Sequence, residues 1–437
     1  MRGLTSTLAL VVVLGGLVAY IYFVDSKRPA GGADAKEKPI TVEAEQIEEF
    51  QLQSASGEKS RVTKSGDAWK IVEPEAADAD STAMSTLSSQ LTSVEVQRVV
   101  DENPGDLKQY GLNPPRIDLG YRLKGEKEFK HLFVGDKTPT GGDLFAKTPD
   151  KNRVFLIASY FDSTLNKTPF DLRDKTVLKF DREKADGLLL VKGTKEMQFS
   201  RMGTDWKISR PVAARGDYAA LEGLLTRLSS AQMDKIVSAE PKDLKEYGLD
   251  KPSQMATVIA GSSRASLLFG NKTEGGLYAK DASRPMVFVV EPTFAADLDK
   301  DISEFRRKDM FDARSFSTNR LEVKRGADAV AFDKTKAADG KEQWKDAAGK
   351  MVDLMKVEDL ISKLSNLRAQ SYEATTNAAL KTPALAVTIR FDESKNETVT
   401  LAKSGSDAFG ARTDEPASAK LDASLYDEVV KALDALK

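Results

Sequence analysis

The sequence predicts an α+β chain in which one N-terminal transmembrane helix is followed by three tandem repeats of an antiparallel sheet-and-helix module. Two recurring strings carry the repeat. Trp-Lys-Ile-x-x-Pro at residues 69–74 returns at 206–211, and Asp-Leu-Lys-x-Tyr-Gly-Leu at 106–112 returns at 243–249. Two unrelated strings therefore share one offset of 137 residues. A common offset of this kind indicates duplication of a whole structural unit.

A third, diverged copy follows the first two. Trp344-Lys345 lies 138 residues after Trp206-Lys207 but lacks the proline that ends the earlier strings. Leu360 and Leu364 fall where the helices of the earlier copies have leucines. The tyrosine string is missing, and only Leu380-Lys381-Thr382-Pro383 remains near its place. The third repeat is thus predicted from its tryptophan strand and its helix.

Each module is predicted to open with a β-hairpin, which is clearest at 187–193 and 197–202,. The Trp-Lys strand follows, and then an amphipathic helix with a preceding aspartate as N-cap, Asp217 in the second copy and Asp353 in the third,. The further strands expected are 130–135, 143–147 and 154–157 in the first copy and 266–270, 277–280 and 286–290 in the second. Runs of strands with few helices between them favour an antiparallel α+β fold over a nucleotide-binding parallel sheet.

The repeats set the predicted division of the chain. The divisions are 1–28 for the anchor with its flanks, 29–40 for a linker, and 41–177, 178–314 and 315–437 for the three modules. The connections near Asp174–Asp181 and Asp309–Ser317 are short. Short connections predict modules in close contact rather than beads on a flexible string.

The predicted anchor is Leu4–Val24, an uncharged stretch of 21 residues. At about 1.5 Å per helical residue, this length matches the hydrocarbon core of a bilayer. The alternative is a cleaved signal peptide, which normally has a shorter apolar region followed closely by small residues. Here the charged segment Asp25–Arg28 follows directly, which favours an uncleaved anchor. Positive residues flank both sides, so charge leaves the orientation open.

Composition excludes several functional classes. The 67 acidic residues nearly cancel the 65 basic ones, and no basic stripe is present, so nucleic acid is not an expected partner,. There is no cysteine, which excludes disulfides, thiolate metal sites, a cysteine nucleophile and a lipoprotein anchor,. His131 is the single histidine, so the most versatile general base is nearly absent,.

The recurring motifs have structural interpretations that are stronger than the functional ones. Trp69, Trp206 and Trp344 could stack on a ligand, but a tryptophan at a fixed place in a repeat more often closes a hairpin onto the core. The Tyr-Gly-Leu strings are typical of a left-handed helix C-cap. The Gly135–Gly142 segment resembles a phosphate loop only superficially, because it lacks the required residue order, and a hairpin connection is favoured.

No residue is singled out as catalytic, cofactor-binding or metal-binding. His131 is expected in a strand, and the matching run of the second copy has no histidine. Serine and lysine nucleophiles are not excluded by counting, but neither a Gly-x-Ser-x-Gly elbow nor a supported Ser-x-x-Lys string is found,.

The N-terminal anchor together with the tandem tryptophan and tyrosine strings resembles a bacterial family catalogued as domain of unknown function 4340. The resemblance extends over most of the chain after the linker and is best between residues 60 and 300; the third copy departs from it by losing the tyrosine string. Members of that family resemble single-pass envelope proteins, and their genes often lie beside those for subunits of ABC transporters of the gliding-motility-associated type, including the large extracytoplasmic auxiliary subunit. The resemblance therefore implies an accessory role outside the cytoplasm. It implies no catalytic residues.

Taken together, the residues and the resemblance lead us to expect a non-catalytic accessory or scaffold protein of an ABC-type transport complex, anchored in the bacterial inner membrane with most of the chain in the periplasm. The expected partners are the membrane and the proteins of that complex, with no cofactor. Two alternatives remain open: an envelope enzyme acting on cell-wall or lipid material, and a structural protein that binds the cell wall.

Overall fold

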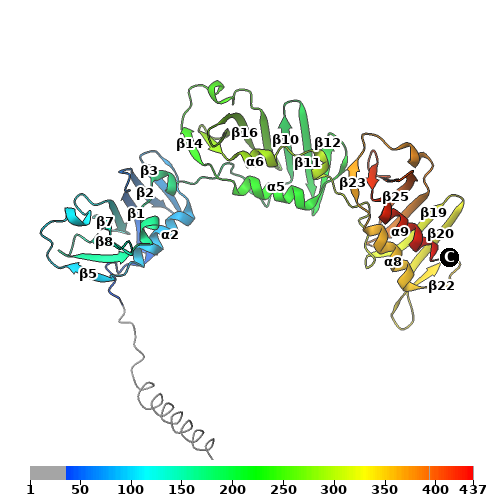
Figure 1. Ribbon diagram of the computed structural model, residues 1–437, viewed down its shortest axis with the longest axis horizontal. Coiled ribbons are helices and arrows are strands. Elements are labelled where there is room, and N and C mark those ends of the chain that lie inside the picture. Colours follow the sequence, from blue (N-terminus) through cyan, green and yellow to red (C-terminus); the bar gives the residue numbers. More distant parts are fainter. Residues whose placement is uncertain (1–35, 393, 437) are drawn as a thin grey trace, which may run out of the picture. The chain divides into compact units, whose positions relative to one another are not determined.

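The computed structural model describes residues 36–392 and 394–436, which form three antiparallel sheets of nine strands each, with helices packed on them (Figure 1). The α+β class and the three repeated modules are as predicted. The predicted transmembrane helix, Leu4–Val24, lies outside the described residues, and so do the first residues of the 29–40 linker. Within the described part of the chain, no helix has both the length and the apolar character needed to cross a membrane.

The three sheets have the same strand order. In the first sheet the order is β4-β3-β2-β1-β6-β7-β8-β9-β5, and every neighbouring pair is antiparallel. A meander of four strands thus forms one half of each sheet, and a second meander forms the other half. The second and third sheets repeat this order strand by strand. The described chain divides into two compact units, one that ends at residue 175 and holds the first sheet, and one that begins at residue 176 and holds the other two.

The elements of the first module are β1 (Ile47–Gln53), β2 (Lys59–Ser65), β3 (Ala68–Glu73), β4 (Ala77–Asp78), β5 (Arg98–Asp101), β6 (Ile117–Leu123), β7 (Lys130–Lys137), β8 (Asp143–Lys147) and β9 (Val154–Ala158), with helices η2 (Ala44–Gln46), α2 (Ser81–Thr92), η3 (Lys108–Tyr110), α3 (Phe161–Leu165) and α4 (Pro169–Leu172). Those of the second are β10 (Gly187–Lys192), β11 (Lys195–Met202), β12 (Asp205–Arg210), β13 (Ala214–Arg215), β14 (Lys235–Ser238), β15 (Gln254–Ala260), β16 (Ser263–Thr273), β17 (Gly276–Asp281) and β18 (Val287–Val290), with α5 (Tyr218–Ser230), η4 (Lys245–Tyr247), α6 (Pro292–Asp297) and α7 (Ile302–Phe305). Those of the third are β19 (Thr318–Arg325), β20 (Asp328–Lys336), β21 (Glu342–Asp346), β22 (Met351–Val352), β23 (Ala369–Tyr372), β24 (Leu385–Phe391), β25 (Lys395–Ser404), β26 (Asp407–Arg412) and β27 (Ala419–Leu421), with α8 (Leu354–Ser365), η5 (Ala378–Lys381) and α9 (Ala423–Asp434).

The long helix of each module begins at an aspartate. Asp217 accepts a hydrogen bond from the backbone N–H of Ala220 at 2.8 Å, and Asp353 accepts one from Met355 at 2.9 Å, as predicted. Asp80 does the same for α2. Each aspartate satisfies an N–H group that the helix itself leaves unpaired, and the carboxylate also suits the positive end of the helix dipole.

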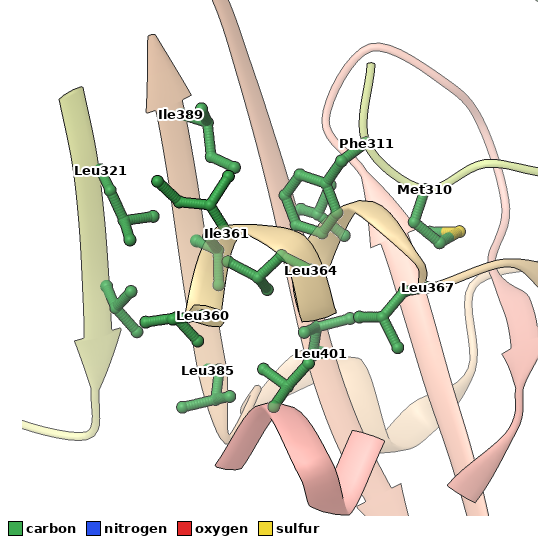
Figure 2. Packing of buried hydrophobic residues seen from close by; sticks show 14 of the residues in the cluster. Met310, Phe311, Leu321, Leu360, Ile361, Leu364, Leu367, Leu385, Ile389 and Leu401 are labelled. Carbon is green, nitrogen blue, oxygen red and sulfur yellow. The ribbon is translucent and has the colours of Figure 1, made fainter. Parts of the chain in front are cut away.

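The helices bury their leucines against one face of the sheet. In the third module, Leu360, Ile361 and Leu364 of α8 point into the sheet, and Leu321 and Ile389 face them (Figure 2). The tryptophans belong to these cores, as predicted. Their exposed fractions are 7% for Trp69, 2% for Trp206 and 0% for Trp344.

The tyrosine strings form short turns that end in left-handed glycines, as predicted. Gly111 has φ 66° and Gly248 has φ 68°, values that favour glycine over residues with a side chain,. In the third module, η5 occupies this part of the chain and ends at Thr382 with a negative φ, so no glycine is required there.

The same turns explain a pair of glycines in the strands beneath them. A Cβ atom on Gly135 would lie 2.0 Å from the carbonyl oxygen of Tyr110, and one on Gly270 would lie 2.0 Å from that of Tyr247. The glycine of the recurring Gly-Asp/Asn-Lys-Thr sequence is therefore required by close backbone packing. Its loop joins β7 to β8 in one module and β16 to β17 in the next, which confirms the predicted hairpin connection.

Substituting Gly270→Ala is expected to lower the free energy of unfolding by about 3 kcal/mol, because a backbone carbonyl must move to admit the methyl group. The matched control is Gly223→Ala within α5, where the added methyl meets nothing within 4 Å. Alanine there should raise stability by about 0.5–1 kcal/mol. Denaturant unfolding followed by tryptophan fluorescence measures both. Equal effects of the two substitutions would contradict the close-packing interpretation.

Candidate functional site

The sequence singled out no catalytic or ligand-binding residue, and its one histidine belongs to no larger cluster of metal-ligating side chains in the described chain. His131 lies in β7, as predicted, and its Nδ1 atom is 2.7 Å from a carboxylate oxygen of Asp118 on the neighbouring strand β6. Both side chains are partly exposed. Among residues 36–392 and 394–436, no group of three or more histidine and carboxylate side chains is arranged as a metal site.

One end of each sheet is a two-residue strand, β4, β13 or β22, which we call the outer edge strand. It comes directly before the aspartate that caps the long helix. In the first two modules the chain returns to this strand after its short helices. Residues 172–174 lie along β4, and residues 305–307 lie along β13; we call these the covering segments.

The covering segments complete the hydrogen bonding of the edge. In the second module, the N–H of Asp217 donates to the carbonyl of Phe305 at 2.7 Å, and the N–H of Arg307 donates to the carbonyl of Arg215 at 3.0 Å. The first module has the same pair of bonds, from Asp80 to Leu172 at 2.8 Å and from Asp174 to Asp78 at 2.9 Å. The two bonds therefore recur at equivalent residues.

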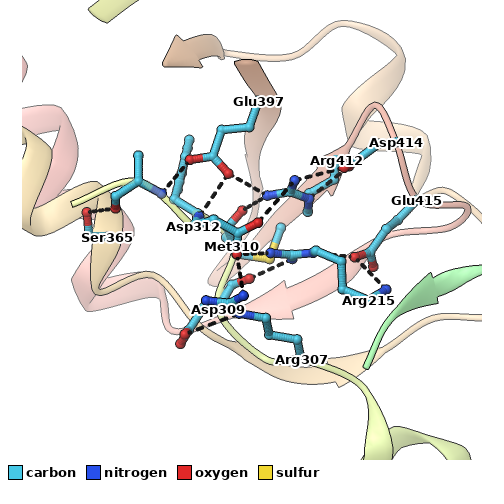
Figure 3. Close-up of polar contacts among 12 residues, drawn as sticks. Arg215, Arg307, Asp309, Met310, Asp312, Ser365, Glu397, Arg412, Asp414 and Glu415 are labelled. Atoms are coloured by element: carbon cyan, nitrogen blue, oxygen red, sulfur yellow. Dashed lines mark hydrogen bonds and ion pairs between the residues drawn. The ribbon is translucent and has the colours of Figure 1, made fainter. Parts of the chain in front are cut away.

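Charged side chains join the second and third modules within the second unit (Figure 3). Glu415, between β26 and β27, accepts a hydrogen bond from Nε of Arg215 at 2.6 Å and one from Arg306 at 2.9 Å. Arg215 also contacts Asp312 at 2.7 Å. We call Arg215, Arg306, Asp312 and Glu415 the joint. Its presence agrees with the close contact that the short connection near 309–317 predicted.

The joint is largely removed from water. The exposed fractions of the side chains are 6% for Arg306 and 7% for Glu415. The Arg306 guanidinium also lies 3.5 Å from the ring centre of Tyr372, a cation–π contact that arginine makes readily,. Burial raises the pKa of Tyr372 to about 12, so its hydroxyl keeps its proton and donates to the carbonyl of Arg307.

Beneath the joint, a buried ion pair holds the start of the third module. Glu397 accepts hydrogen bonds from the N–H groups of Asp312 and Ala313 and from Arg412, each at 2.8 Å. Burial alone would lower the pKa of Arg412, but its hydrogen bonds to Asp414 and Glu397 raise that pKa above the ordinary arginine value. The guanidinium thus stays charged, and it also donates to the carbonyl of Met310. Glu397 thus holds the connection directly, through Asp312 and Ala313, and indirectly, through Arg412 and Met310.

A second buried carboxylate, Glu49 in β1, is also fully engaged. Burial would raise its pKa, but hydrogen bonds from Arg122 and Arg61 bring the pKa below the ordinary value of 4.5. A carboxyl group that holds no proton at neutral pH cannot serve as a general acid. Its geometry indicates a structural role.

The hollows in the described part of the second unit include a cleft and a groove. A cleft of about 470 Å³ borders the joint and is lined by the edge residues Arg215–Ala219 and by Arg307, Asp309 and Asp312. A groove of about 700 Å³ lies between the β10–β11 hairpin and the connection from α6 to α7. Leu190, Met197 and Leu298 form apolar walls of the groove.

The groove has a filled counterpart in the third module. There, Leu433 and Leu436 at the end of α9 pack against Val323 and Val330, and only about 30 Å³ remains. An ion pair ties the helix end to the hairpin in both modules, Lys192 with Asp299 and Arg325 with Asp434. In the first module, Asn166 accepts a hydrogen bond from the N–H of Ala55 instead. At this place the third module therefore lacks the open groove that the second module has.

The family model described as Domain of unknown function (DUF4340) matches residues 69–215 and 206–387. The chain belongs to this family. The two matches overlap and together extend over more than half of the sequence, which confirms the resemblance seen in the tryptophan and tyrosine strings.

The DUF4340 matches do not follow the sheets. The first begins at Trp69 in β3 and ends at Arg215 in β13, and the second begins at Trp206 in β12 and ends in β24. Each match thus starts inside one sheet and ends inside the next. The covering segment, rather than a boundary, lies in the middle of each DUF4340 unit.

Other comparisons add little. The search of curated proteins gave no match. Similar solved structures include a DNA polymerase sliding clamp from Pseudomonas aeruginosa with ligand, at 8% identity, 88% coverage of this chain, 92% of that chain and a TM-score of 0.16. The DNA polymerase III subunit beta from Pseudomonas aeruginosa is 9% identical, with 87% coverage of this chain, 93% of that chain and a TM-score of 0.18. A putative DNA polymerase III beta subunit from Eubacterium rectale is 8% identical, with 89% coverage of this chain, 93% of that chain and a TM-score of 0.16. TM-scores of this size do not establish a shared fold.

Sequence reasoning missed the outer edge strands and the joint. It also missed the strands β6, β15 and β24, which link the two halves of each sheet. The joint pairs Arg215 with Glu415, which are 200 residues apart, and neither residue belongs to a repeated string. The sequence contains one usable signal, since the covering segments share an apolar residue followed by arginine, Leu172-Arg173 and Phe305-Arg306.

Substituting Glu415→Ala should loosen the joint, because it leaves two buried arginines without their shared partner. Breaking a buried ion pair costs about 3 kcal/mol. Trypsin reports the opening, since Arg306, Arg307 and Lys308 lie in the connection. When opening and closing are fast, the rate of cleavage follows the population of the open form. Cleavage at the connection should then become about 100-fold faster.

The control for this substitution is Asp427→Ala, which removes an exposed partner of Lys403 in the same module. An exposed pair contributes at most about 1 kcal/mol, so cleavage at the connection should stay near the wild-type rate. Equal cleavage of the two variants would show that the joint does not hold the modules together.

Proposed function

We propose that this chain is a non-catalytic scaffold, an accessory subunit of an ABC-type transport system of the gliding-motility-associated kind, which acts outside the cytoplasm. The observation that carries the scaffold role is the joint. There, and in the Glu397–Arg412 pair beneath it, buried charges of the second unit are paired with one another and connect one module to the next. The resemblance to envelope proteins encoded beside ABC-transporter subunits supports the transport role.

The proposal includes a single membrane anchor at Leu4–Val24 in the bacterial inner membrane, with the modules in the periplasm. Its support is the length and uncharged character of that stretch. An anchor of this kind keeps the modules near the bilayer, where subunits of a transporter lie. Repeated modules offer an extended surface that a partner can contact at several points.

The groove in the second module favours an alternative. A hollow of about 700 Å³ with apolar walls is within the size range of small-molecule sites,. An envelope enzyme acting on cell-wall or lipid material would have its site there. A protein that binds the cell wall without a transporter is the third possibility. Retention on purified peptidoglycan would favour the wall-binding protein. Loss of function on filling the groove with Thr194→Trp would favour the enzyme.

The topology is testable because the natural chain has no cysteine. Met202 has an exposed fraction of 64%, so Met202→Cys should react with a membrane-impermeant maleimide once the outer membrane is permeabilised. The control is Gly3→Cys, on the other side of the predicted anchor, which should react only after lysis of the inner membrane. Reaction of both residues, or of Gly3→Cys alone, in unlysed cells would contradict the proposed orientation.

The transport role predicts stable partners. After crosslinking in cells and extraction in mild detergent, the tagged chain should retain an ATPase subunit and a multi-span permease at near-stoichiometric levels. Mass spectrometry of the purified material identifies them, and an equally abundant tagged protein with an unrelated single anchor is the control. Recovery of the chain alone would overturn the transport role.

A further inference from the structure

The outer edge strand of the third module is open. β22 is the last strand of its sheet and pairs only with β21, through Lys345–Met351 and Trp344–Val352. Figure 1 shows β22 at the margin of the third module. Within residues 36–392 and 394–436, no covering segment lies along it. In both other modules the equivalent strand is covered.

The helix caps set the equivalence of these edges residue by residue. Asp353, Asp217 and Asp80 cap the three long helices, so Met351 stands where Arg215 and Asp78 stand. The carbonyl of Arg215 and the N–H of Asp217 both bond to the covering segment. In the described chain, the carbonyl of Met351 and the N–H of Asp353 have no such backbone partner. Edge groups of this kind are ready to pair with another strand.

The side chains along this edge change in the third module from charged to apolar. The side chain of Arg215 forms an ion pair with Asp312 in the joint, and that of Asp78 forms an ion pair with Lys70. Met351 in their place is 53% exposed. Met355 is 72% exposed and lies in the first turn of α8. In the second module, the positions equivalent to these two, Arg215 and Ala219, line one cleft together with the connection to the third module. The methionines therefore occupy the surface that receives a neighbouring segment.

The chemistry of the edge indicates what it receives. Methionine side chains adapt to varied apolar partners. Lys345 and Lys350 flank Met351, and neither forms an ion pair in the described part of the chain. Edge lysines disfavour pairing of the strand with a second copy of itself. A partner segment with carboxylates beside a bulky apolar residue complements both features.

We propose that β22 with Met351 and Met355 is a docking edge, to which a partner protein adds an extended segment bearing an apolar residue and nearby carboxylates. The segment lies as the covering segments of the first two modules lie, with backbone hydrogen bonds to Met351 and Asp353. Strand addition to an open sheet edge is a common mode of recognition. This inference rests on the proposed scaffold function and names the surface through which it acts.

A photo-crosslinking amino acid at position 351 of the full chain, expressed in its own cells, tests the proposal. It should give one discrete adduct, and mass spectrometry should locate the crosslink in an extended, acidic and apolar segment of another protein. Met355→Glu should lower the adduct yield about tenfold, because it adds a repelling charge to the edge. Met355→Leu keeps the apolar contact and should leave the yield unchanged.

The same amino acid at Met202, which is exposed in the second module, is the positional control and should not give this adduct. The docking edge is overturned if position 351 gives no protein adduct, if the adduct is a second copy of this chain, or if Met355→Glu leaves the yield unchanged. Retention of the permease and ATPase without an adduct at 351 would reject the edge and keep the transport role. An edge adduct to a protein outside any transporter would keep the edge and reject that role.

Discussion

Pairing of backbone groups at the sheet edges is the constraint on which the rest of the structure depends. A nine-stranded sheet that remains open has two edges, and each edge presents N–H and C=O groups that need partners. In the first two modules the chain itself supplies them at one of the two edges, the outer edge strand, through residues 172–174 and 305–307. The segment that leaves a module therefore completes its sheet. The short helices before it bring the chain back to β4 or β13 at the right position.

The joint fixes the orientation of the third module relative to this paired edge. Backbone bonds hold residues 305–307 on β13, and the charges then fix the third module relative to that edge. Arginine suits this task, because its planar group donates in several fixed directions and stacks on aromatic rings. Arg306 uses both properties, with Glu415 on one side and Tyr372 against its face. The buried pair of Glu397 and Arg412 anchors the receiving end. Removing one partner of such a pair is costly, because the other charge is left buried without compensation.

Features set by local chemistry were predictable from the sequence, and features set by distant contacts were not. The caps at Asp217 and Asp353, the buried tryptophans and the left-handed Gly111 and Gly248 each follow from a few neighbouring residues. The third sheet was predictable although its tyrosine string is lost, because its helix and tryptophan strand remain. The need for Gly270 arises from a carbonyl more than twenty residues away, and the joint links residues 200 apart. No periodic pattern marks such contacts, so the edge and the joint required the structure.

The frame of the DUF4340 match has a consequence for how such arrays change in length. A unit that runs from one tryptophan strand to the next holds the second half of one sheet, its covering segment and the first half of the following sheet. Duplication of that unit in a gene would add a module together with the covering segment for that module's own outer edge strand in a single event. The outer edge strand of each added module would be paired as soon as the duplication occurred. The outer edge strand of the last module would keep its present sequence. Growth by this route conserves both ends of the array while the number of modules increases.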